Sequence, residues 1–583
     1  MIRGLDQAAK SLGIAPEANS TKAKHSDEQS NSSDDIPMMY RAQVKGRCSL
    51  MFAGDNEDLE TWKDEWVNPN PEQPRYQKKQ PSLGLDGEIY RILVKFPFRL
   101  VSNCGQDSII RPIIGKDGIP YLSGSSVKGL FRRACNTIQT KKYCGDDENL
   151  VPSSLGFRFH GAYPVGDWGG TQKVTVWRNG ETITEVRYRM LDVIHPQQER
   201  QVGSDKHQKA TALASVSLYK PTMIFEFSSS DTNVDWTEVE DIFWESIALG
   251  VGGKTSIGYG LGGYNDCHPA GVPKSKVHIA LKGRGVSPTL RSDEPEFRPN
   301  LFKASLRGHF RRLLAGVVDD LEKLDPEVDR LFGSSSSPGV IQLSWQQKEV
   351  NYSIFGKTQT FQAEGILHLN ATRDNDVQLI EQVLKFSFIM GGFGKSWRRA
   401  SHELFYKTYK KFEIGCHWEL SSTNWSWMLI KSTNELRTFL EGIHQTYAKQ
   451  YASSKLSSQN WRESWRPDRL SVYATVTRES KAIKLFHDDI YKYTPAIGGK
   501  NLGDKRPKFI SSVWHRMLPI GEGSFLEIIT IFHAKREEWD HHTEGDQLYK
   551  FVQSLENQGL SFTWGNPKPP AKKAKRMIPN PQK

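Results

Sequence analysis

An eight-residue segment occurs twice in the chain, and this internal repeat constrains the fold more than any other feature. The segment SVKGLFRR at residues 126–133 recurs as SLRGHFRR at residues 305–312, with the same residue type at seven of eight positions. A second pair of similar segments follows in the same order, GKT at 253–255 and GKS at 394–396. Two related domains in tandem are the simplest explanation for two motifs repeated in one order.

The distance between the two motifs differs between the copies. It is 128 residues in the first copy (126 to 254) and 90 in the second (305 to 395), so the first carries about 38 additional residues. Loops tolerate added length at little entropic cost, so we predict an insertion in the first domain. The predicted organisation of the 583 residues is a disordered leader at 1–39, an extension and loop at 40–87, a first domain with a hairpin insertion at 88–272, a second domain with a C-terminal extension at 273–564, and a basic tail at 565–583.

The composition indicates ordered cores and a polyanionic partner. Hydrophobic residues make up 37% of the chain and charged residues 25%, which is typical of globular proteins. The net charge of +11 favours a polyanionic partner without identifying it. The six cysteines contain no CxxC pair, so neither zinc nor a disulfide framework is predicted. No apolar run is long enough to span a membrane and the N-terminus lacks a signal-peptide core, so we predict a cytoplasmic protein without a membrane partner.

Each copy of the octapeptide is predicted to open a helix that follows a strand and a loop. Apolar residues recur at helical spacing from 127 to 138 and from 306 to 318, whereas the upstream segments 90–100 and 276–282 alternate as strands do. Further strands are predicted at 223–227, 365–369 and 525–532, and further helices at 241–249, 377–388 and 434–449. This mixture predicts α+β domains with antiparallel sheets.

The start of each predicted helix has the composition of a phosphate site. Ser125 or Ser126 in the first copy and Ser305 in the second are the predicted N-caps. Lys128 and Arg307 then lie in the first turn, where the helix dipole disfavours a cation, so helix stability does not explain them. Amides at a helix start beside a cation can hold a phosphate, and a solvated basic face is the alternative. The basic surface extends one turn onward through Arg132, Arg133, Arg311 and Arg312.

The glycine-rich segments do not fit a nucleotide-binding P-loop. Ala248 and Ile389 stand where the first glycine of GxxxxGK[ST] is required, so ATP binding is not expected. Glycine lets a backbone approach a phosphodiester closely, and a lysine in the loop supplies charge. A plain glycine-rich turn is the alternative. The residues predicted to contact the phosphodiester are Gly253, Lys254, Thr255 and Lys395, and the predicted stacking surfaces are Tyr259, Tyr264 and Trp397.

Two segments of the first half resemble a known family. The segments PYLSGSSVKG at 120–129 and GVGGKTSIGYGLG at 250–262 resemble the RAMP (repeat-associated mysterious protein) superfamily of CRISPR type III effector complexes. In the second half, residues 300–316, 331–339 and 506–523 look like the RAMP subunits that sit towards the 3′ end of the guide. The resemblance covers about residues 88–535.

The resemblance implies a fold and a function. Each half is expected to be a ferredoxin-like, RNA-recognition-type RAMP domain, and the chain a backbone subunit that binds guide RNA in antiviral and anti-plasmid defence. Its other implied partners are target RNA and further subunits of the effector complex. Residues 174–188 (VTVWRNGETITEVRY) are predicted to form a hairpin around Asn179-Gly180. This hairpin is either a thumb that wedges between guide and target bases, as in family backbone subunits, or a surface hairpin.

Catalysis is an open alternative at this stage. Active relatives carry an aspartate before the phosphate helix, so Asp107 is the candidate for target RNA cleavage, with Asp293 as its second-half counterpart. Neither aligns cleanly with the family position, and whether the chain is an enzyme stays open. No cofactor is expected for a binding subunit, and Mg²⁺ would be needed if the chain cleaved RNA. Processing of guide precursor would require a histidine, for which the candidates are His160, His195 and His207. His487-Asp488 and the segment 540–542 are interpreted as surface polar residues.

Overall fold

The computed structural model describes residues 79–567 with internal gaps, and the structural statements below concern these residues. The described ranges are 79–102, 113–114, 119–146, 149–166, 168, 171–178, 180–188, 191–193, 214–255, 258–261, 275–289, 294–318, 321–334, 337–356, 358–394, 398–406, 415–421, 427–451, 463–491, 494–499, 509–533, 539 and 547–567. No helix in these ranges is long and apolar enough to cross a membrane. The fold is mixed, with helices packed on sheets that are antiparallel except for the pairs β7–β14 and β16–β21, in agreement with the α+β prediction.

The first half contains a four-stranded sheet in the order β1-β2-β12-β6, in which each neighbouring pair is antiparallel. Its strands are β1 (Gly84–Asp86), β2 (Ile89–Lys95), β12 (Thr222–Ser228) and β6 (Arg158–Val165). Helix α4 (Gly124–Arg132) lies between β2 and β6 in the chain, and α7 (Trp236–Ala248) follows β12. The smaller elements are β3 (Arg99–Leu100), β4 (Ile113–Ile114), β5 (Pro120–Tyr121), α5 (Thr137–Gln139), the π-helix η4 (Thr140–Cys144), β9 (Leu191–Val193), β10 (Ala214–Val216) and β11 (Leu218–Tyr219).

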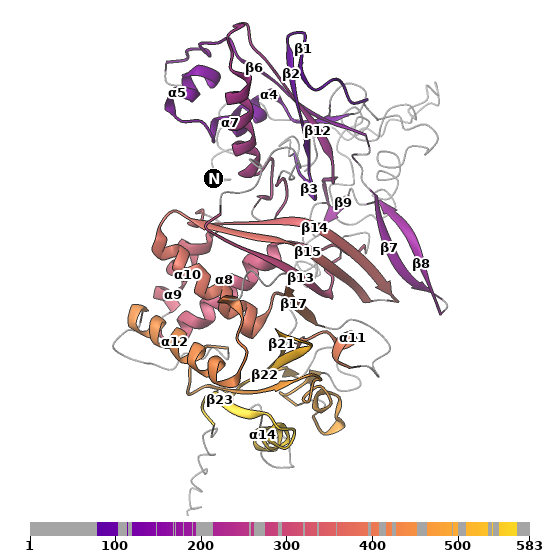
Figure 1. Cartoon of the computed structure of the whole chain (residues 1–583), viewed down its shortest axis with the longest axis vertical. Helices are drawn as coiled ribbons and strands as arrows, with labels where there is room; N and C mark the ends of the chain where they lie inside the picture. Colours follow the sequence, from indigo (N-terminus) through magenta and orange to yellow (C-terminus); the bar gives the residue numbers. More distant parts are fainter. Residues whose placement is uncertain are drawn as a thin grey trace, which may run out of the picture. The chain divides into compact units, whose positions relative to one another are not determined.

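The second half contains a six-stranded sheet in the order β17-β13-β15-β14-β7-β8 (Figure 1). Its own strands are β13 (Val277–Val286), β14 (Ile341–Phe355), β15 (Thr358–Ala371) and β17 (Cys416–Leu420). Its helices are α8 (Asn300–Ala315), α9 (Leu321–Phe332), α10 (Asp374–Phe386) and the π-helix η7 (Ser387–Gly391). The four strands therefore lie in the order fourth, first, third, second, and the chain follows the path β-α-β-β-α-β. The first half repeats the first-third-second part of this order with β2, β12 and β6.

The predicted hairpin is present, and it completes the sheet of the other half. Strands β7 (Thr171–Arg178) and β8 (Glu181–Tyr188) pair with each other, and β7 runs parallel to β14. Val174 and Val176 are buried in the core of the second half, whereas Trp177 and Val186 are exposed. The insertion is therefore anchored along one strand instead of projecting freely.

A third sheet follows in the C-terminal region, where a helix at 434–449 and a strand at 525–532 were predicted but no separate sheet. Its order is β16-β21-β22-β18-β23. The elements of this region are β16 (Arg398–Arg399), α11 (His402–Phe405), α12 (Thr433–Tyr451), β18 (Leu470–Thr477), the 3-10 helices η9 (Leu485–His487) and η10 (Asp489–Tyr491), β19 (Gly498–Gly499), β20 (Phe509–Ile510), β21 (Val513–Gly521), β22 (Ser524–Phe532), α14 (Gln547–Asn557) and β23 (Ser561–Gly565). Val472 and Ile528 belong to the core that includes α8, whereas Tyr473 and Ile529 belong to a second core with α14. Both faces of this sheet are therefore buried.

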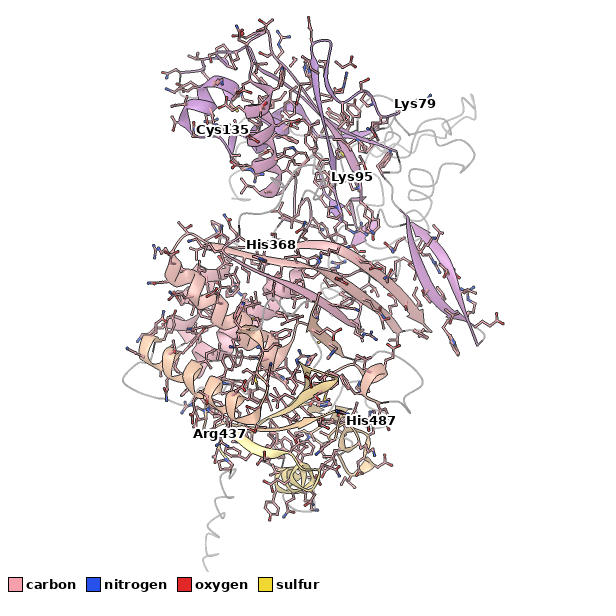
Figure 2. The ribbon with its side chains drawn as sticks, in the orientation of Figure 1. Lys79, Lys95, Cys135, His368, Arg437 and His487 are labelled. Atoms are coloured by element: carbon pink, nitrogen blue, oxygen red, sulfur yellow. The ribbon has the colours of Figure 1, made fainter. Side chains whose placement is uncertain are left out.

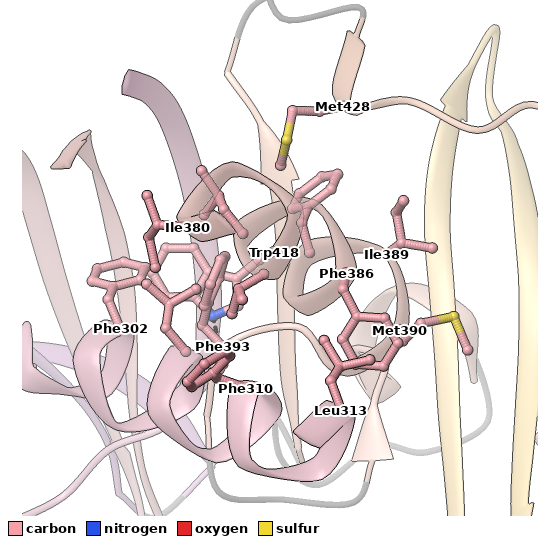
Figure 3. Packing of buried hydrophobic residues seen from close by; sticks show 14 of the residues in the cluster. Phe302, Phe310, Leu313, Ile380, Phe386, Ile389, Met390, Phe393, Trp418 and Met428 are labelled. Atoms are coloured by element: carbon pink, nitrogen blue, oxygen red, sulfur yellow. Dashed lines mark hydrogen bonds between the residues drawn. The ribbon is translucent and has the colours of Figure 1, made fainter. Parts of the chain in front are cut away.

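The largest core is formed where α8 and α10 pack on the second-half sheet. Figure 3 shows Phe302, Phe310 and Leu313 on one face of α8, opposite aromatic and aliphatic side chains from α10 and the segment after it. Trp418 of β17 is fully buried there, and its indole Nε1 donates to the carbonyl oxygen of Phe393 at 2.8 Å. This contact fastens the glycine segment after α10 to the sheet.

The helix starts differ from the prediction in both copies. Ser123 caps α4, with its Oγ accepting from the amide of Ser126 at 3.2 Å, so Ser125 and Ser126 lie in the first turn instead of capping it. Helix α8 begins at Asn300 after Pro299, so Ser305 is the sixth residue of the helix. The predicted caps were wrong because α4 begins at Gly124 and α8 at Asn300, which places the serines chosen as caps inside the helices.

A buried ion pair joins the two halves. Arg99 of β3 and Glu296, which precedes α8, are both fully buried, and the guanidinium Nε donates to the Glu296 carboxylate. The Arg99 Nη1 also donates to the Ser217 hydroxyl at 2.7 Å, and the guanidinium carbon lies 5.1 Å from the ring centre of Tyr219.

We expect Arg99→Ala to lower the free energy of unfolding by about 3–5 kcal/mol, because it leaves the Glu296 carboxylate buried without its counter-ion. The double variant Arg99→Met/Glu296→Leu removes both charges and should cost much less. Urea unfolding of the three proteins measures the difference. Equal losses in the single and double variants would contradict the assignment of the pair.

Candidate functional site

The two motifs of the first half, more than a hundred residues apart in sequence, meet at one cavity. The cavity has a volume of about 460 Å³. Ser126, Gly129 and Arg133 of the α4 region line one side of it, and Gly252 and Gly253 line the other. The helix start and the glycine loop predicted to contact a phosphodiester are therefore parts of a single surface.

The surface of α4 around this cavity is exposed and carries basic residues, of which Arg133 lines the cavity itself. Ser125, Ser126, Gly129 and Arg132 are exposed on α4, and the first turn contains no acidic residue. Lys128 is the fifth residue of α4 and not a first-turn residue as predicted, and it is not among the residues that line the cavity. It is half-buried and forms no ion pair within the described part of the chain. Hydroxyl groups and a cation without a carboxylate partner favour binding of an anion at this position.

Gly129 has no structural reason to be glycine. It lies inside α4, where glycine costs about 1 kcal/mol relative to alanine. A Cβ atom built on Gly129 would have no neighbour within 4 Å, so packing does not exclude a side chain. The residue lines the cavity, and a bare backbone there allows a ligand to approach closely.

The glycine loop is held by hydrogen bonds to the strand segment before α4. The amide of Gly253 donates to the carbonyl oxygen of Val101 at 2.8 Å, and the amide of Gly260 donates to that of Arg99 at 2.6 Å. Gly252 has a φ of +71°, and a Cβ on it would lie 2.2 Å from the Val101 oxygen. A Cβ on Gly258 would lie 2.7 Å from Pro299. Close packing against the protein thus explains why Gly252 and Gly258 are glycines. The surface that the loop leaves for a ligand lies around Gly252, Lys254 and Thr255.

Tyr259 is not a stacking surface, contrary to the sequence prediction. Its side chain is fully buried and packs edge-on against Phe98, with ring centres 5.4 Å apart. The Lys254 ammonium lies 5.7 Å from the centre of the same ring. Tyr264 and Trp397 lie outside the described residues.

The second half brings the corresponding motifs together. The Ser305 hydroxyl accepts from the amide of Gly394 at 3.3 Å, so α8 meets its glycine segment as α4 meets residues 252–253. The two motifs that repeat in the sequence therefore repeat as a contact in space. Lys395 lies outside the described residues.

The cations of the second copy are engaged within the protein. Arg307 is the eighth residue of α8, not a first-turn residue as predicted, and its Nη2 donates to Asp329 at 2.6 Å. Arg311 pairs with Asp325 at 2.9 Å. Arg312 donates through Nε to Glu463 at 2.8 Å and lies over the ring of Trp514. The RNA contacts predicted for these three arginines stay predictions, and each would compete with an existing carboxylate.

Arg133 connects the first cavity to a larger one. Its Nη2 donates to the carbonyl oxygen of Gly250 at 2.7 Å, which ties the end of α4 to the glycine loop. The larger cavity has a volume of about 1140 Å³ and is lined by residues of both halves, among them Arg133, Thr255 and Arg307. Three residues predicted separately as contacts thus border one space.

The wall of the larger cavity includes a histidine that stays neutral. His368 of β15 (Figure 2) is buried, and burial together with His278 lowers its pKa to about 4. Its ring nitrogens lie 2.9 Å from the Ser275 hydroxyl and 3.2 Å from the Gln346 side-chain oxygen. Near neutral pH, His368 therefore adds hydrogen bonds but no charge to the cavity.

The residues considered for catalysis form no cluster in the described part of the chain. Asp107, Asp293, His195, His207 and the segment 540–542 lie outside it. His160 lies 2.8 Å from the Ser228 hydroxyl, and His487 (Figure 2) stacks on Tyr406 with ring centres 4.3 Å apart. No group of three or more His, Cys, Asp or Glu side chains placed to hold a metal ion occurs among the described residues. Cleavage through Asp107 stays a prediction.

Comparisons with known proteins find similar solved structures but no sequence family. No family model and no curated protein matches the chain. Cmr1 from Pyrococcus furiosus is 14% identical, with a TM-score of 0.34 over 49% of this chain and 98% of Cmr1. A chain of the type III-B Cmr-beta complex bound to cognate target RNA and AMPPnP is 10% identical, with a TM-score of 0.27 over 48% of this chain and 98% of that chain. A chain of another type III-B Cmr-beta structure with cognate target RNA is 17% identical, with a TM-score of 0.20 over 30% and 57%.

We expect acidification to destabilise the protein partly through His368. The folded-state pKa of about 4 lies below the unfolded value of about 6.5, so the unfolded chain binds the extra proton between these values. The stabilising contribution is complete above pH 6.5 and is lost as the pH falls towards 4, by about 3 kcal/mol. Urea unfolding at pH 7 and pH 4 should show a smaller loss for His368→Asn than for the wild type. Identical losses in the two proteins would contradict this account.

Proposed function

We propose that the chain is an RNA-binding backbone subunit of a CRISPR type III effector complex, which holds guide RNA through its phosphates. One observation carries the proposal: the helix start and the glycine loop of the first half line one cavity, and Lys128 on the same helix forms no ion pair among the described residues. The RAMP-like motifs of the sequence are the segments that build this cavity. Target RNA and other effector subunits are the further proposed partners.

The strand order supports a ferredoxin-like fold in each half as part of this proposal. In the second half, a β-α-β-β-α-β path with the spatial order fourth, first, third, second is the arrangement of that fold. The first half has three of the four strands in the same relative order. Two such units in tandem are consistent with RAMP domains in which a helix start and a glycine loop lie together.

The proposed binding mode uses the backbone of the RNA and not its sequence. Exposed hydroxyls of Ser125 and Ser126, the amides at the start of α4 and the Lys128 ammonium are all donors suited to phosphate oxygens. Contacts of this kind position a strand without reading its bases. A subunit that must accept guides of any sequence requires this property.

We expect Lys128→Glu to weaken binding of single-stranded RNA about tenfold or more, because it reverses charge beside the helix start. The salt dependence of binding should become shallower by about 0.7 in logarithmic slope for the lost contact. Fluorescence anisotropy with a labelled RNA at several salt concentrations measures both quantities. Lys323→Glu, an exposed lysine on α9, makes the same charge change away from the cavity and serves as the control. Equal effects of the two variants would remove the phosphate site.

The variant Gly129→Ala separates binding from stability. It should raise the free energy of unfolding by about 0.5–1 kcal/mol, because alanine is the better helix former and the space for its methyl group is open. Its affinity for RNA should fall several-fold, because the methyl group enters the cavity. Thermal unfolding and anisotropy titration of the same preparation give both values. A more stable variant that binds RNA as tightly as the wild type would show that α4 does not approach a ligand here.

A further inference from the structure

The larger cavity, of about 1140 Å³, has the composition of a ligand site. It lies where the ends of α4 and α7 face α8 and the segments 333–334 and 337–339. Its volume reaches the upper range of small-molecule sites and exceeds what a bare phosphate ion would need. The proposed RNA-binding function so far assigns it no role.

The second-half wall of the cavity holds a half-buried lysine next to an arginine. Lys303 of α8 lines the cavity, is half-buried and forms no ion pair among the described residues. Arg307 lies one turn further along the helix and also lines the cavity. Burial and the neighbouring Arg307 lower the pKa of the Lys303 ammonium. Keeping two cations adjacent at a partly buried position costs stability, and a bound anion would offset that cost.

The remaining walls suit the other parts of a nucleotide. Ser334 and Ser337 form a tight loop, with their hydroxyls 3.0 Å apart and the Ser334 amide donating to the Ser337 carbonyl at 2.8 Å. Both line the cavity next to the cations, where hydroxyl groups can reach a phosphate or a sugar. An apolar wall is supplied by Leu249, Leu261 and Phe332. Leu249 is 42% exposed, so the wall is accessible to a planar ring.

One carboxylate also borders the space, and it does not reverse the charge balance. Glu245 of α7 lines the cavity on the first-half side, where Arg133 lies as well. Three cations, Arg133, Lys303 and Arg307, and one acidic side chain line the cavity. Arg307 is also paired with Asp329 at 2.6 Å, so Lys303 is the cation that most favours an anionic ligand.

We propose that this cavity binds one nucleoside-phosphate unit, with the phosphate at Lys303 and Arg307 and the base against the apolar wall. The proposal rests on the proposed RNA-binding function and adds a site for a base to the phosphate contacts at α4. The unit is either a nucleotide of the bound RNA strand or a free nucleotide, since both present the same chemistry. An acidic protein segment would satisfy the cations but would not require the apolar wall.

The test compares Lys303→Gln with Lys323→Gln, a matched change on the exposed face of α9. Full-length protein is irradiated with single-stranded RNA that contains 4-thiouridine, and the cross-linked peptides are mapped by mass spectrometry. We expect cross-links in the peptide that carries residues 331–344 and at least a fivefold loss of them in Lys303→Gln only. Thermal unfolding should show Lys303→Gln at least as stable as the wild type, since a half-buried charge is removed.

In a second experiment, adenosine monophosphate is titrated by calorimetry into the wild type, Lys303→Gln and Lys323→Gln. Saturable binding that Lys303→Gln abolishes supports the site with a free nucleotide as its source, whereas RNA cross-linking without such binding supports a nucleotide of the strand. Cross-links that map only elsewhere, together with no binding of the monophosphate, overturn the proposal. The proposal is also overturned if a titrated acidic peptide saturates the protein and adenosine monophosphate does not bind. If the wild type binds no RNA, or if Lys128→Glu binds RNA as the wild type does, the proposed function fails instead. The titration with adenosine monophosphate still shows whether the cavity binds a nucleotide.

Discussion

A three-residue segment, strand β3 and the following Val101, determines where the candidate site lies. The side chain of Arg99 reaches Glu296 before α8, while its carbonyl oxygen accepts from Gly260. Two residues later, the carbonyl oxygen of Val101 accepts from Gly253. The same short segment therefore holds the glycine loop against α4 and connects the first half to the helix of the second. Both cavities depend on it, because each is bounded by the loop that this segment positions.

The basic residues of the two copies of the repeated motif differ in their partners, because α4 is exposed whereas α8 is enclosed. In the first half, the polar face of α4 is open, and its serines and Arg132 are exposed. In the second half, the third sheet and the segment before it pack against α8, and Arg312 is bound by Glu463 and Trp514. A helix enclosed in this way uses its cations for internal pairs. The open copy is therefore the better candidate for RNA, and the enclosed copy supports the fold.

The sequence allowed a prediction of most elements but not of their environment. The helices at 241–249, 377–388 and 434–449 were recognisable because their apolar residues recur at helical spacing. The strand at 525–532 was recognisable by its run of isoleucine, threonine and phenylalanine, although both of its faces are buried. Strands β18 and β21 of the third sheet were not predicted, because both of their faces are buried and the alternation that marks a strand is absent. The repetition of the two motifs in one order predicted tandem domains, whereas their meeting at one cavity became visible only in the structure. The burial of Tyr259 and the pairs of Arg311 and Arg312 could not be predicted, since they depend on residues brought close only by folding.

The pairing of β7 with β14 makes the folding of the second half depend on the first. Val174 and Tyr352 are register partners although 178 residues separate them, so the hairpin leaves the ribosome long before its partner strand. During that interval Val174 and Val176, which end fully buried, lie on an unpaired strand edge. Contacts of such long sequence separation form slowly, and an exposed apolar edge invites pairing with other chains. Assembly of this protein is thus sensitive to the rate of synthesis between the hairpin and β14, and the isolated second half would have an unprotected β14 edge.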